Sequence, residues 1–227
     1  MNDVVDLGLP SGTLWCKYNL GVNPNRLLIP EDWYGDYYAW GELEPNKTDE
    51  DGKIYFDWSN YKFGKSFNKL TKYCNMSTYG LNGFTDNLTQ LQPEDDAAYQ
   101  NKHIGNYKFY IPTKEQCEEL INYTKNYWVK NYNPNKIKHN QEDDGGIQGL
   151  NGGVFEGKNR NQLFIPAAGS RDGFLNKDTD SCCRLWSSSL CLKNPGNIYY
   201  LLFKPNYINM IDFYGCGGQS VRPVINL

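Results

Sequence analysis

The feature that most constrains this fold is the alternation of two kinds of segment in residues 163–227. Short blocks of small residues, β-formers and one Trp (IPAAG, SRDG, LWSSS and SVRPV) are separated by irregular stretches rich in Asn, Tyr, Cys, Ser and Asp. The blocks are typical of a packed scaffold, and the stretches between them are typical of exposed contact loops. We therefore expect a rigid scaffold that presents a surface, and the pattern favours binding over catalysis.

The composition favours short strands and loops over a helical bundle. Aromatic residues make up 15% of the chain, Gly occurs 22 times, and long aliphatic runs are few. Because Trp and Tyr each remove a large area from water, the 227 residues can bury a sizeable core as a single domain. We expect residues 1–162 to form a scaffold with two helices, and residues 163–227 to carry the binding face.

Charge and hydropathy exclude several classes of protein. The net charge is −3 and no basic run occurs, whereas nucleic-acid binding needs a field of Lys and Arg. No apolar stretch approaches the length of a membrane span, so we expect no membrane insertion. The first residues, MNDVVDLGLPSG, lack the basic and apolar regions of a signal peptide, which indicates a protein not exported by that route or a trimmed sequence.

Two segments predict helices. One begins near Pro93, because Pro in the first turn followed by three acids suits the positive end of the helix dipole. The other begins at Thr113, which forms a capping-box pattern with Gln116. Cys117 and Leu120 then fall on one face of this helix, so we expect Cys117 to be a small buried residue rather than a reactive one.

Strands are predicted at both ends of the chain. Two of them surround a Pro-Ser-Gly turn in residues 4–21, and the aromatic-rich segment 33–47 is typical of a strand or an irregular core segment. Residues 44–92 are expected to be mostly loop, and residues 125–162 to be two strands around an acidic, Gly-rich loop. The tail predicts short strands at LFIPAA, RLWSSS, IYYLLF and SVRPVINL. This order predicts an α+β fold and not a repeating βαβ fold.

The cysteines do not form a disulfide framework. There are seven, an odd number at irregular spacing: Cys16, Cys74, Cys117, Cys182, Cys183, Cys191 and Cys216. The chain has no C-x-x-C pair and only two His, so the sequence does not predict a structural zinc site. Free thiols are favoured, and a disulfide within the tail stays open as the alternative.

A calcium site is weighed for residues 141–153, QEDDGGIQGLNGG. The segment lacks the alternating acid ligands and the closing Glu of an EF-hand loop, so a solvated turn is favoured. We expect no metal and no cofactor, and we do not expect calcium-dependent sugar binding.

The three serines of LWSSS do not predict a nucleophile. A reactive Ser needs a base within hydrogen-bond reach, and His103 and His139 lie in polar, loop-rich contexts. No G-x-S-x-G elbow surrounds the serines. We expect Ser187, Ser188 and Ser189 to satisfy backbone groups beside a buried Trp186.

Two adjacent acids carry the remaining candidate chemistry. Asp95 and Asp96 point about 100° apart on a helix, so they cannot face each other as an acid–base pair. One is expected to cap a helix or to pair with Arg171 or Arg222, and the other is expected to be solvated. A metal site that uses one of the two carboxylates stays open as an alternative.

Two arginines are expected to have structural roles. Arg222 precedes Pro223 in a predicted terminal strand, and we expect it to be buried and paired with a carboxylate. In SRDG, Arg171 and Asp172 are expected to pair across a turn in which Gly173 supplies a positive φ.

Seven blocks, in order and covering almost the whole chain, carry a family resemblance: VDLGLPSGTLW, YGDYYAWGE, LQPEDDAA, FYIPTKEQCEELIN, LFIPAAGSRDG, LWSSSL and SVRPV. The chain resembles the Fibrobacter major-paralogous-domain family, which is abundant in gut Bacteroidetes and their phages. The resemblance implies a C-type-lectin-like fold of the variety shared with formylglycine-generating enzymes. That fold is a compact α+β domain with two helices, a small antiparallel sheet and much irregular structure.

Some members of this group resemble the variable proteins of diversity-generating retroelements. In those proteins adenine-directed mutagenesis randomises Asn codons in the C-terminal part of the lectin fold. Lys177, Lys193, Lys204, Met210 and Gln219 are not reachable from an Asn codon in this way and would have to be fixed. The reachable residues between the blocks are the candidate ligand-binding set: Asn176, Asp178, Ser181, Cys182, Cys183, Arg184, Leu190, Cys191, Leu192, Tyr200, Asn206, Tyr207, Asp212, Phe213, Tyr214 and Cys216.

The resulting hypothesis is a non-enzymatic ligand-binding domain with its binding face in residues 174–219. Tyr200, Tyr207, Phe213 and Tyr214 would supply rigid amphipathic area, and Asn, Ser and Asp would supply adaptable hydrogen bonds. Trp15, Trp40, Trp186 and the IPAAG block would hold the scaffold. The adjacent Cys182 and Cys183 are attributed to randomisation and not to a need of the fold.

The ligand is expected to be a protein or a glycan on another cell, and the location a cell surface or a phage particle. The first alternative is a structural or adhesive module of a surface protein or phage fibre without diversification. The second alternative is a thiol enzyme of the formylglycine-generating type, although fold resemblance alone does not transfer chemistry and no charged partner of a tail cysteine is evident.

Overall fold

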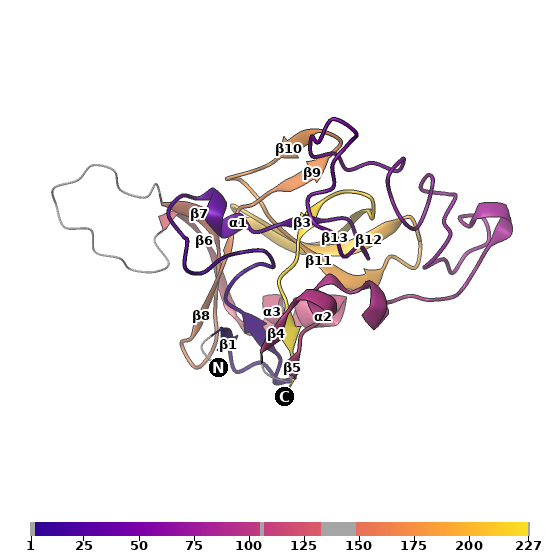
Figure 1. Ribbon diagram of the computed structural model, residues 1–227. Coiled ribbons are helices and arrows are strands. Elements are labelled where there is room, and N and C mark those ends of the chain that lie inside the picture. The colour runs from indigo at the N-terminus through magenta and orange to yellow at the C-terminus, as the bar shows by residue number, and fades with distance from the viewer. Residues whose placement is uncertain (1–2, 105–106, 133–148, 227) are drawn as a thin grey trace.

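The computed structural model describes residues 3–104, 107–132 and 149–226 of the chain, and it has a mixed α+β fold built of small sheets, few helices and much irregular structure (Figure 1). The α+β prediction is confirmed at this level. The helical elements are α1 (Glu31–Tyr34), α2 (Ala97–Asn101), α3 (Lys114–Tyr123), and the 3₁₀ turns η1 (Leu81–Gly83) and η2 (Pro93–Asp95).

The central element is a five-stranded sheet in the order β13-β12-β11-β14-β3. Its strands are antiparallel except for the pair formed by β11 and β14, which is parallel. Because β3 comes from the first fifth of the chain, this sheet joins residues far apart in sequence. Its strands are β3 (Tyr37–Tyr38), β11 (Cys183–Leu190), β12 (Asn197–Lys204), β13 (Tyr207–Tyr214) and β14 (Gln219–Ser220).

Four smaller sheets surround it. A three-stranded sheet has the order β6-β7-β8, another has the order β1-β2-β15, and β9 with β10 and β4 with β5 form two-stranded sheets. The strands are β1 (Val4–Asp6), β2 (Leu14–Cys16), β4 (His103–Ile104), β5 (Tyr107–Lys108), β6 (Lys125–Tyr132), β7 (Leu150–Glu156), β8 (Gln162–Pro166), β9 (Ser170–Asp172), β10 (Leu175–Lys177) and β15 (Val224–Ile225).

Several sequence predictions of strands are confirmed. β1 and β2 pair antiparallel around the Pro-Ser-Gly turn, and the C-terminal β15 pairs with β2, which places the two ends of the chain side by side (Figure 1). The strand β8 begins at Gln162, just before the expected division between residues 162 and 163, and pairs with β7 along its whole length.

Apolar clusters cover both faces of the central sheet. Trp186, Tyr200 and Leu202 face one cluster, which also contains Trp40. Leu185 and Leu201 face the other cluster, and α3 packs on that side. Burying each such side chain stabilises the fold by about 1.5–3 kcal/mol. The predicted scaffold tryptophans are confirmed as core, since Trp15, Trp40 and Trp186 are all buried.

The helix predicted from Thr113 is confirmed with its cap. The Thr113 hydroxyl accepts from the Gln116 N–H at 3.2 Å, and the Gln116 side chain accepts from the Thr113 N–H at 2.9 Å. Cys117 and Leu120 are fully buried on the face that packs on the sheet, as expected. The cap contributes about 1 kcal/mol to the stability of the helix.

The prediction of one helix beginning at Pro93 is wrong. The chain makes the 3₁₀ turn η2 and then leaves the helical region at Asp96, where φ is −90° and ψ is 109°. The Asp96 carboxylate caps the separate helix α2 by accepting from the Ala98 and Tyr99 N–H groups at 2.8 and 3.1 Å. A local hydrogen bond of this kind competes with helix continuation, which explains the break.

The part of the segment 33–47 up to residue 42 is mostly buried, as predicted, whereas residues 43–47 are partly or fully exposed. The first two residues of the segment belong to the short helix α1, which the sequence did not indicate. Residues 44–92 form mostly loop, as predicted. Asp86 ties this loop together by accepting from the Tyr73 and Cys74 N–H groups at 2.8 and 2.9 Å. Tyr61, Phe63 and Tyr73 anchor it in the core, so its order does not depend on strands or long helices.

Of the helices described, none combines the length and apolar character needed to cross a bilayer.

Candidate functional site

The edge strand β13 exposes one row of side chains on the face of the central sheet opposite α3. Its register with β12 puts Ile211 beside Tyr200, Asn209 beside Leu202 and Tyr207 beside Lys204. Side chains alternate between the two faces of a strand, so these residues share a face. Tyr207 and Asn209 are exposed there, and Ile211 and Phe213 are half-buried against the core.

The β9–β10 hairpin lies next to this row. Gly173 turns the hairpin with φ +55°, which confirms its predicted role, and the next two residues, Phe174 and Leu175, are 58% and 61% exposed. The ring of Tyr55 stacks on Phe174 with centroids 4.4 Å apart. Large apolar side chains held this far into solvent on a tight turn are available for contact with a partner.

Close packing and an ion pair connect the hairpin with the sheet. A Cβ placed on Gly217 would lie 3.0 Å from Phe213 and 3.5 Å from the Arg171 carbonyl, so the end of β13 and the base of β9 approach each other over this glycine. Arg184 forms an ion pair with Asp178, which follows β10, and donates to the Tyr200 hydroxyl at 3.1 Å.

We call this surface the hairpin face. It has an apolar and aromatic part on the hairpin and a mixed polar and aromatic part on β13, joined by the Arg184–Asp178 pair. Its members are Tyr55, Phe174, Leu175, Asn176, Asp178, Arg184, Tyr207, Asn209, Ile211 and Phe213.

The candidate residues from the sequence divide by burial. Eight are exposed, and Arg184 and Phe213 are half-buried. The exposed residues are Asn176, Asp178, Ser181, Leu192, Asn206, Tyr207, Asp212 and Tyr214. Six others are enclosed and offer no contact surface in this structure, which removes them from the candidate site: Cys182, Cys183, Leu190, Cys191, Tyr200 and Cys216.

The exposed candidates do not form one patch. Asn206 and Tyr207 lie at the β12–β13 turn, whereas Leu192 lies at the opposite end of the sheet in the β11–β12 turn. Strands of eight residues span roughly 25 Å, which separates these two ends. Asp212 projects to the α3 side, where it accepts from the Asn197 amide at 2.6 Å.

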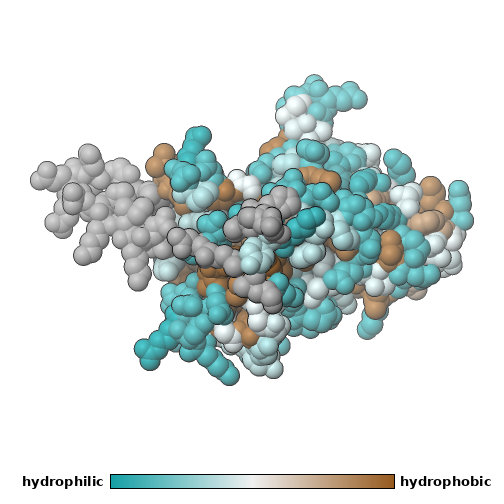
Figure 2. Space-filling model, turned by 60° about the horizontal axis from the view of Figure 1, so that its bottom comes forward, coloured by the Kyte–Doolittle hydropathy of each residue, from teal (hydrophilic) through white to brown (hydrophobic). Residues whose placement is uncertain are grey.

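Leu192 belongs instead to a second exposed apolar group on the loop at residues 65–84. The Asn75 amide donates to the Leu192 carbonyl at 3.3 Å, which places the turn beside that loop. Figure 2 shows apolar side chains at this end of the molecule, on the right in that view. The exposed apolar residues of the loop are Phe67, Met76, Leu81 and Phe84.

The structure explains the two adjacent cysteines by packing. Cys182 belongs to the cluster on one face of the central sheet, and Cys183 belongs to the cluster on the other. The attribution of this pair to randomisation alone is therefore revised: small apolar side chains are needed at both positions. All seven cysteines are free and buried, so the open alternative of a tail disulfide is resolved in favour of thiols.

Burial opposes the ionisation of several thiols. Burial raises the pKa of Cys16 to about 11 and that of Cys216 to about 12. Burial also raises the pKa values of Cys117 and Cys183. A thiolate nucleophile needs the opposite, a lowered pKa with access to solvent.

The three serines hold the backbone, as predicted. Ser187 donates to the Tyr199 carbonyl at 2.7 Å, Ser188 lies 3.4 Å from the Pro112 carbonyl, and Ser189 accepts from the Lys114 N–H at 3.1 Å.

Both acids at 95 and 96 are buried, so the expectation that one is solvated is wrong. Asp95 pairs with Lys62 and Lys72 at 2.8 and 2.5 Å, and not with an arginine. Burial opposes the charge of Asp95, but the two lysines together with a hydrogen bond from Tyr73 bring the net pKa below its usual value. Asp95 thus anchors the loop that carries Lys62, Lys72 and Tyr73.

Neither arginine has the predicted carboxylate partner. The fully buried Arg222 donates to Asn19 Oδ1 at 2.8 Å and to the Cys16 and Lys17 carbonyls at 3.0 and 2.7 Å. Neutral acceptors are enough to fix the end of the chain, and burial lowers the Arg222 pKa to about 10. Arg171 lies over the Tyr37 ring at 4.9 Å, while Asp172 pairs with Lys177.

Within the described ranges, no three His, Cys, Asp or Glu residues lie close enough together to hold a metal ion. Most of the segment weighed for calcium, residues 141–148 of 141–153, lies outside the described residues. The expectation of no calcium-dependent sugar binding rested on the absence of a Glu-Pro-Asn or Gln-Pro-Asp triplet, and that premise is wrong because the sequence contains Glu44-Pro45-Asn46. Here the Asn46 amide is engaged, donating to Asp36 at 2.7 Å and accepting from the Tyr37 N–H at 3.1 Å.

Sequence reasoning missed several residues of the hairpin face: Tyr55, Phe174, Leu175, Asn209 and Ile211. A signal for the turn was present in SRDGFLNK, since Gly173 was expected to supply a positive φ there, but the three polar residues before it do not show the alternation of a strand. Residues 207–214 were assigned to an irregular stretch, although they form an eight-residue strand, so the alternation that puts Asn209 on the same face as Tyr207 was not used.

Comparison of the chain with models of known protein families, with curated proteins and with solved structures finds no match.

Proposed function

We propose that this protein is a non-enzymatic ligand-binding domain with a C-type-lectin-like fold that binds its partner through the hairpin face. The observation that carries the proposal is the division within the tail. Trp186 and Tyr200 are enclosed, whereas Phe174, Leu175 and Tyr207 project into solvent from neighbouring, well-fixed elements. A surface with this construction is suited to recognition because the contact residues rest on a rigid support.

The fold assignment rests on general features. The α+β order, the small antiparallel sheets, the paired ends of the chain and the abundance of irregular structure agree with the resemblance of the seven sequence blocks. The main helix α3 packs on one face of the central sheet, which leaves the edge of the opposite face free for a partner.

The chemistry of the hairpin face suits a protein or a glycan on another cell. Tyr207 and Phe174 offer rigid aromatic area at a low entropic cost, and Asn176 and Asn209 offer amides that both donate and accept. The location that fits this role is a cell surface or a phage particle.

Diversification of the tail is part of the proposal in a restricted form. Exposed positions such as Asn176 and Tyr207 can change without affecting the core. Enclosed positions such as Cys183 and Tyr200 cannot, because a polar or larger residue there would cost about 1–3 kcal/mol or more. A retroelement acting on this chain would therefore yield functional receptors chiefly when the exposed positions vary.

The proposal is tested by binding of the fluorescently labelled protein to a panel of bacterial cells and to a glycan array. The variant is Phe174→Ser with Tyr207→Ser, and the matched control is Tyr123→Ser, which removes a tyrosine of comparable exposure from α3. We expect the double variant to lose binding and the control to keep it. Equal binding by all three proteins would show that the ligand is bound outside the hairpin face. No binding to any cell or glycan would leave a structural module as the better account.

A further inference from the structure

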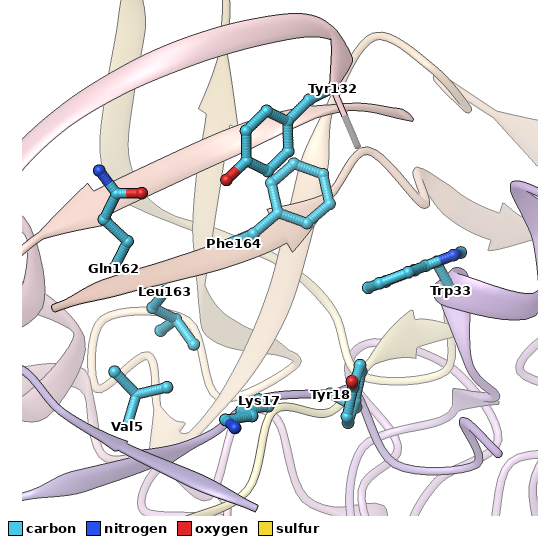
Figure 3. A pocket seen from close by; sticks show the side chains of 8 residues that line it. All are labelled: Val5, Lys17, Tyr18, Trp33, Tyr132, Gln162, Leu163 and Phe164. Atoms are coloured by element: carbon cyan, nitrogen blue, oxygen red, sulfur yellow. The ribbon is translucent and has the colours of Figure 1, made fainter. Parts of the chain in front are cut away.

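A cavity of about 200 Å³ lies away from the hairpin face, between the first part of the chain and the β6–β7–β8 sheet. Lys17 and Tyr18, which follow β2, line one side, Trp33 of α1 lines the end, and Tyr132 and Phe164 of the sheet line the opposite side (Figure 3). The remaining lining residues are Val5, Gln162 and Leu163.

Aromatic rings form opposite walls of this cavity. Tyr132 and Phe164 have ring centroids 5.0 Å apart, and Tyr18 and Trp33 have ring centroids 5.7 Å apart. Both pairs are tilted, so each presents ring faces and edges to the space between them. The negative faces of aromatic rings attract the polarised C–H groups of another ring, whether that ring is aromatic or a sugar. The walls therefore favour a ring-shaped ligand.

The size limits that ligand to one ring. Sites for drug-sized molecules occupy about 300–1,000 Å³, and this cavity is smaller. A single six-membered ring with a few substituents is the largest molecule that it would enclose.

The polar groups that line the cavity indicate which substituents the bound ring would carry. Lys17 is exposed at the rim and forms no ion pair with any described residue, and no lining residue is acidic. Burial, reinforced by nearby Asp3, raises the pKa of Tyr18, so its hydroxyl stays protonated and can donate. Lys17 supplies an ammonium and Tyr18 a hydroxyl on the same side of the cavity, and each can donate to a carboxylate.

Gln162 supplies an acceptor at the other end. Its Nε2 donates to Glu156 at 2.6 Å and to the Tyr127 hydroxyl at 3.2 Å, which fixes the orientation of the amide. Its Oε1 receives no hydrogen bond from the part of the chain that the structure describes, and it points toward the cavity in Figure 3. A hydroxyl on the ligand would satisfy this oxygen.

We propose that this cavity binds a small monocyclic carboxylate that carries a ring hydroxyl. The ring lies between the aromatic walls, the carboxylate meets Lys17 and Tyr18, and the hydroxyl donates to Gln162 Oε1. Two sources share this chemistry, a hexuronic acid from a polysaccharide and a phenolic acid. The site is independent of the hairpin face, so either proposal can fail without the other.

The test is calorimetric or ligand-observed NMR titration with matched probes. The sugar pair is glucuronate and glucose, the phenolic pair is 4-hydroxybenzoate and 4-hydroxybenzyl alcohol, and benzoate reports on the hydroxyl. We expect at least one acid to bind about tenfold or more tightly than its neutral partner, because the charge-assisted contact is lost in the neutral compound. The pair with the tighter acid identifies the source.

Variants connect the binding to these residues. Lys17→Glu should abolish binding of the acid, whereas Lys53→Glu, the same charge change at an exposed loop lysine outside the cavity lining, should leave it unchanged. Gln162→Leu should remove the preference for 4-hydroxybenzoate over benzoate. Unchanged thermal unfolding of each variant shows that the fold is kept. The proposal is overturned if neither acid binds, if acid and neutral probes bind equally, or if Lys17→Glu binds as the wild type does.

Discussion

The Arg184 guanidinium donates to the Tyr200 hydroxyl at 3.1 Å, so an enclosed tyrosine of the scaffold orients a half-buried cation of the hairpin face. The same guanidinium pairs with Asp178 in the turn after β10. One side chain thus connects the core of the sheet to the turn that leads out of the hairpin. This relationship explains how a surface built of irregular segments can keep a fixed shape.

Replacing Arg184 by Met should weaken this connection. We expect the free energy of unfolding to fall by about 1–2 kcal/mol, because a partly buried charge-assisted hydrogen bond is lost while the exposed part of the ion pair contributes little. Urea denaturation measures the change, with Arg160→Met at an exposed turn as the control. Equal stability of the two variants would show that Arg184 does not support the turn.

The packing of the core predicts that two leucines of the tail contribute very differently to the free energy of unfolding. Leu201 is fully enclosed against α3, and Leu192 is about half-exposed in the β11–β12 turn. Leu201→Ala should cost about 2–5 kcal/mol and Leu192→Ala about 0.5 kcal/mol or less, because only the first leaves a cavity. Thermal or urea unfolding of both variants compares them, and similar costs would contradict the assigned burial.

The raised pKa of Asp96 predicts that the stability of the protein declines as the pH rises. Burial outweighs its three backbone hydrogen bonds and raises its pKa to about 6 in the folded protein, above the ordinary value of 3.8. Between these two values the folded state binds more protons than the unfolded state. The stability that Asp96 contributes is therefore fully present below about pH 4 and is lost as the pH rises to about 6, by roughly 3 kcal/mol in all.

The variant Asp96→Asn tests this dependence. Its unfolding free energy, measured by urea denaturation at intervals from pH 4 to 7, should lack the decline that the wild type shows. Asp51→Asn, at an exposed loop position, should retain it. If Asp96→Asn and the wild type change in parallel with pH, the carboxyl of Asp96 is not the group responsible.

The burial of the cysteines predicts low thiol reactivity. With all seven thiols enclosed, labelling by an aromatic disulfide reagent at pH 8 should be slow in the native protein and should reach all seven in denaturant. Rapid modification of a single cysteine in the native protein would contradict this and would revive the thiol-enzyme alternative.

Local signals in the sequence were sufficient for some elements. The capping box at Thr113 and Gln116 determined where α3 begins, because both partners lie within one turn of the helix. The buried tryptophans and the serines of LWSSS were also predicted correctly. These features depend on neighbours in sequence or on hydrophobicity alone.

Features that depend on distant partners were not predictable in the same way. Arg222 was expected to need a carboxylate, but the chain brings the Asn19 amide and two carbonyls to it from the other end of the sequence. Enclosed and exposed candidates of the tail could not be separated either, because Cys182 and Ser181 differ in burial although they are adjacent. Burial at such positions depends on which segments pack over them.

The measurement that tests the central claim most directly does not require a known ligand. It is sequencing of this gene, over residues 170–219, from many genomes of one population. If the hairpin face is the diversified contact surface, substitutions will concentrate at exposed positions such as Asn176, Asp178 and Tyr207, and Cys183, Trp186 and Tyr200 will stay constant. A uniform tail, or substitutions spread equally over enclosed and exposed positions, would contradict the account.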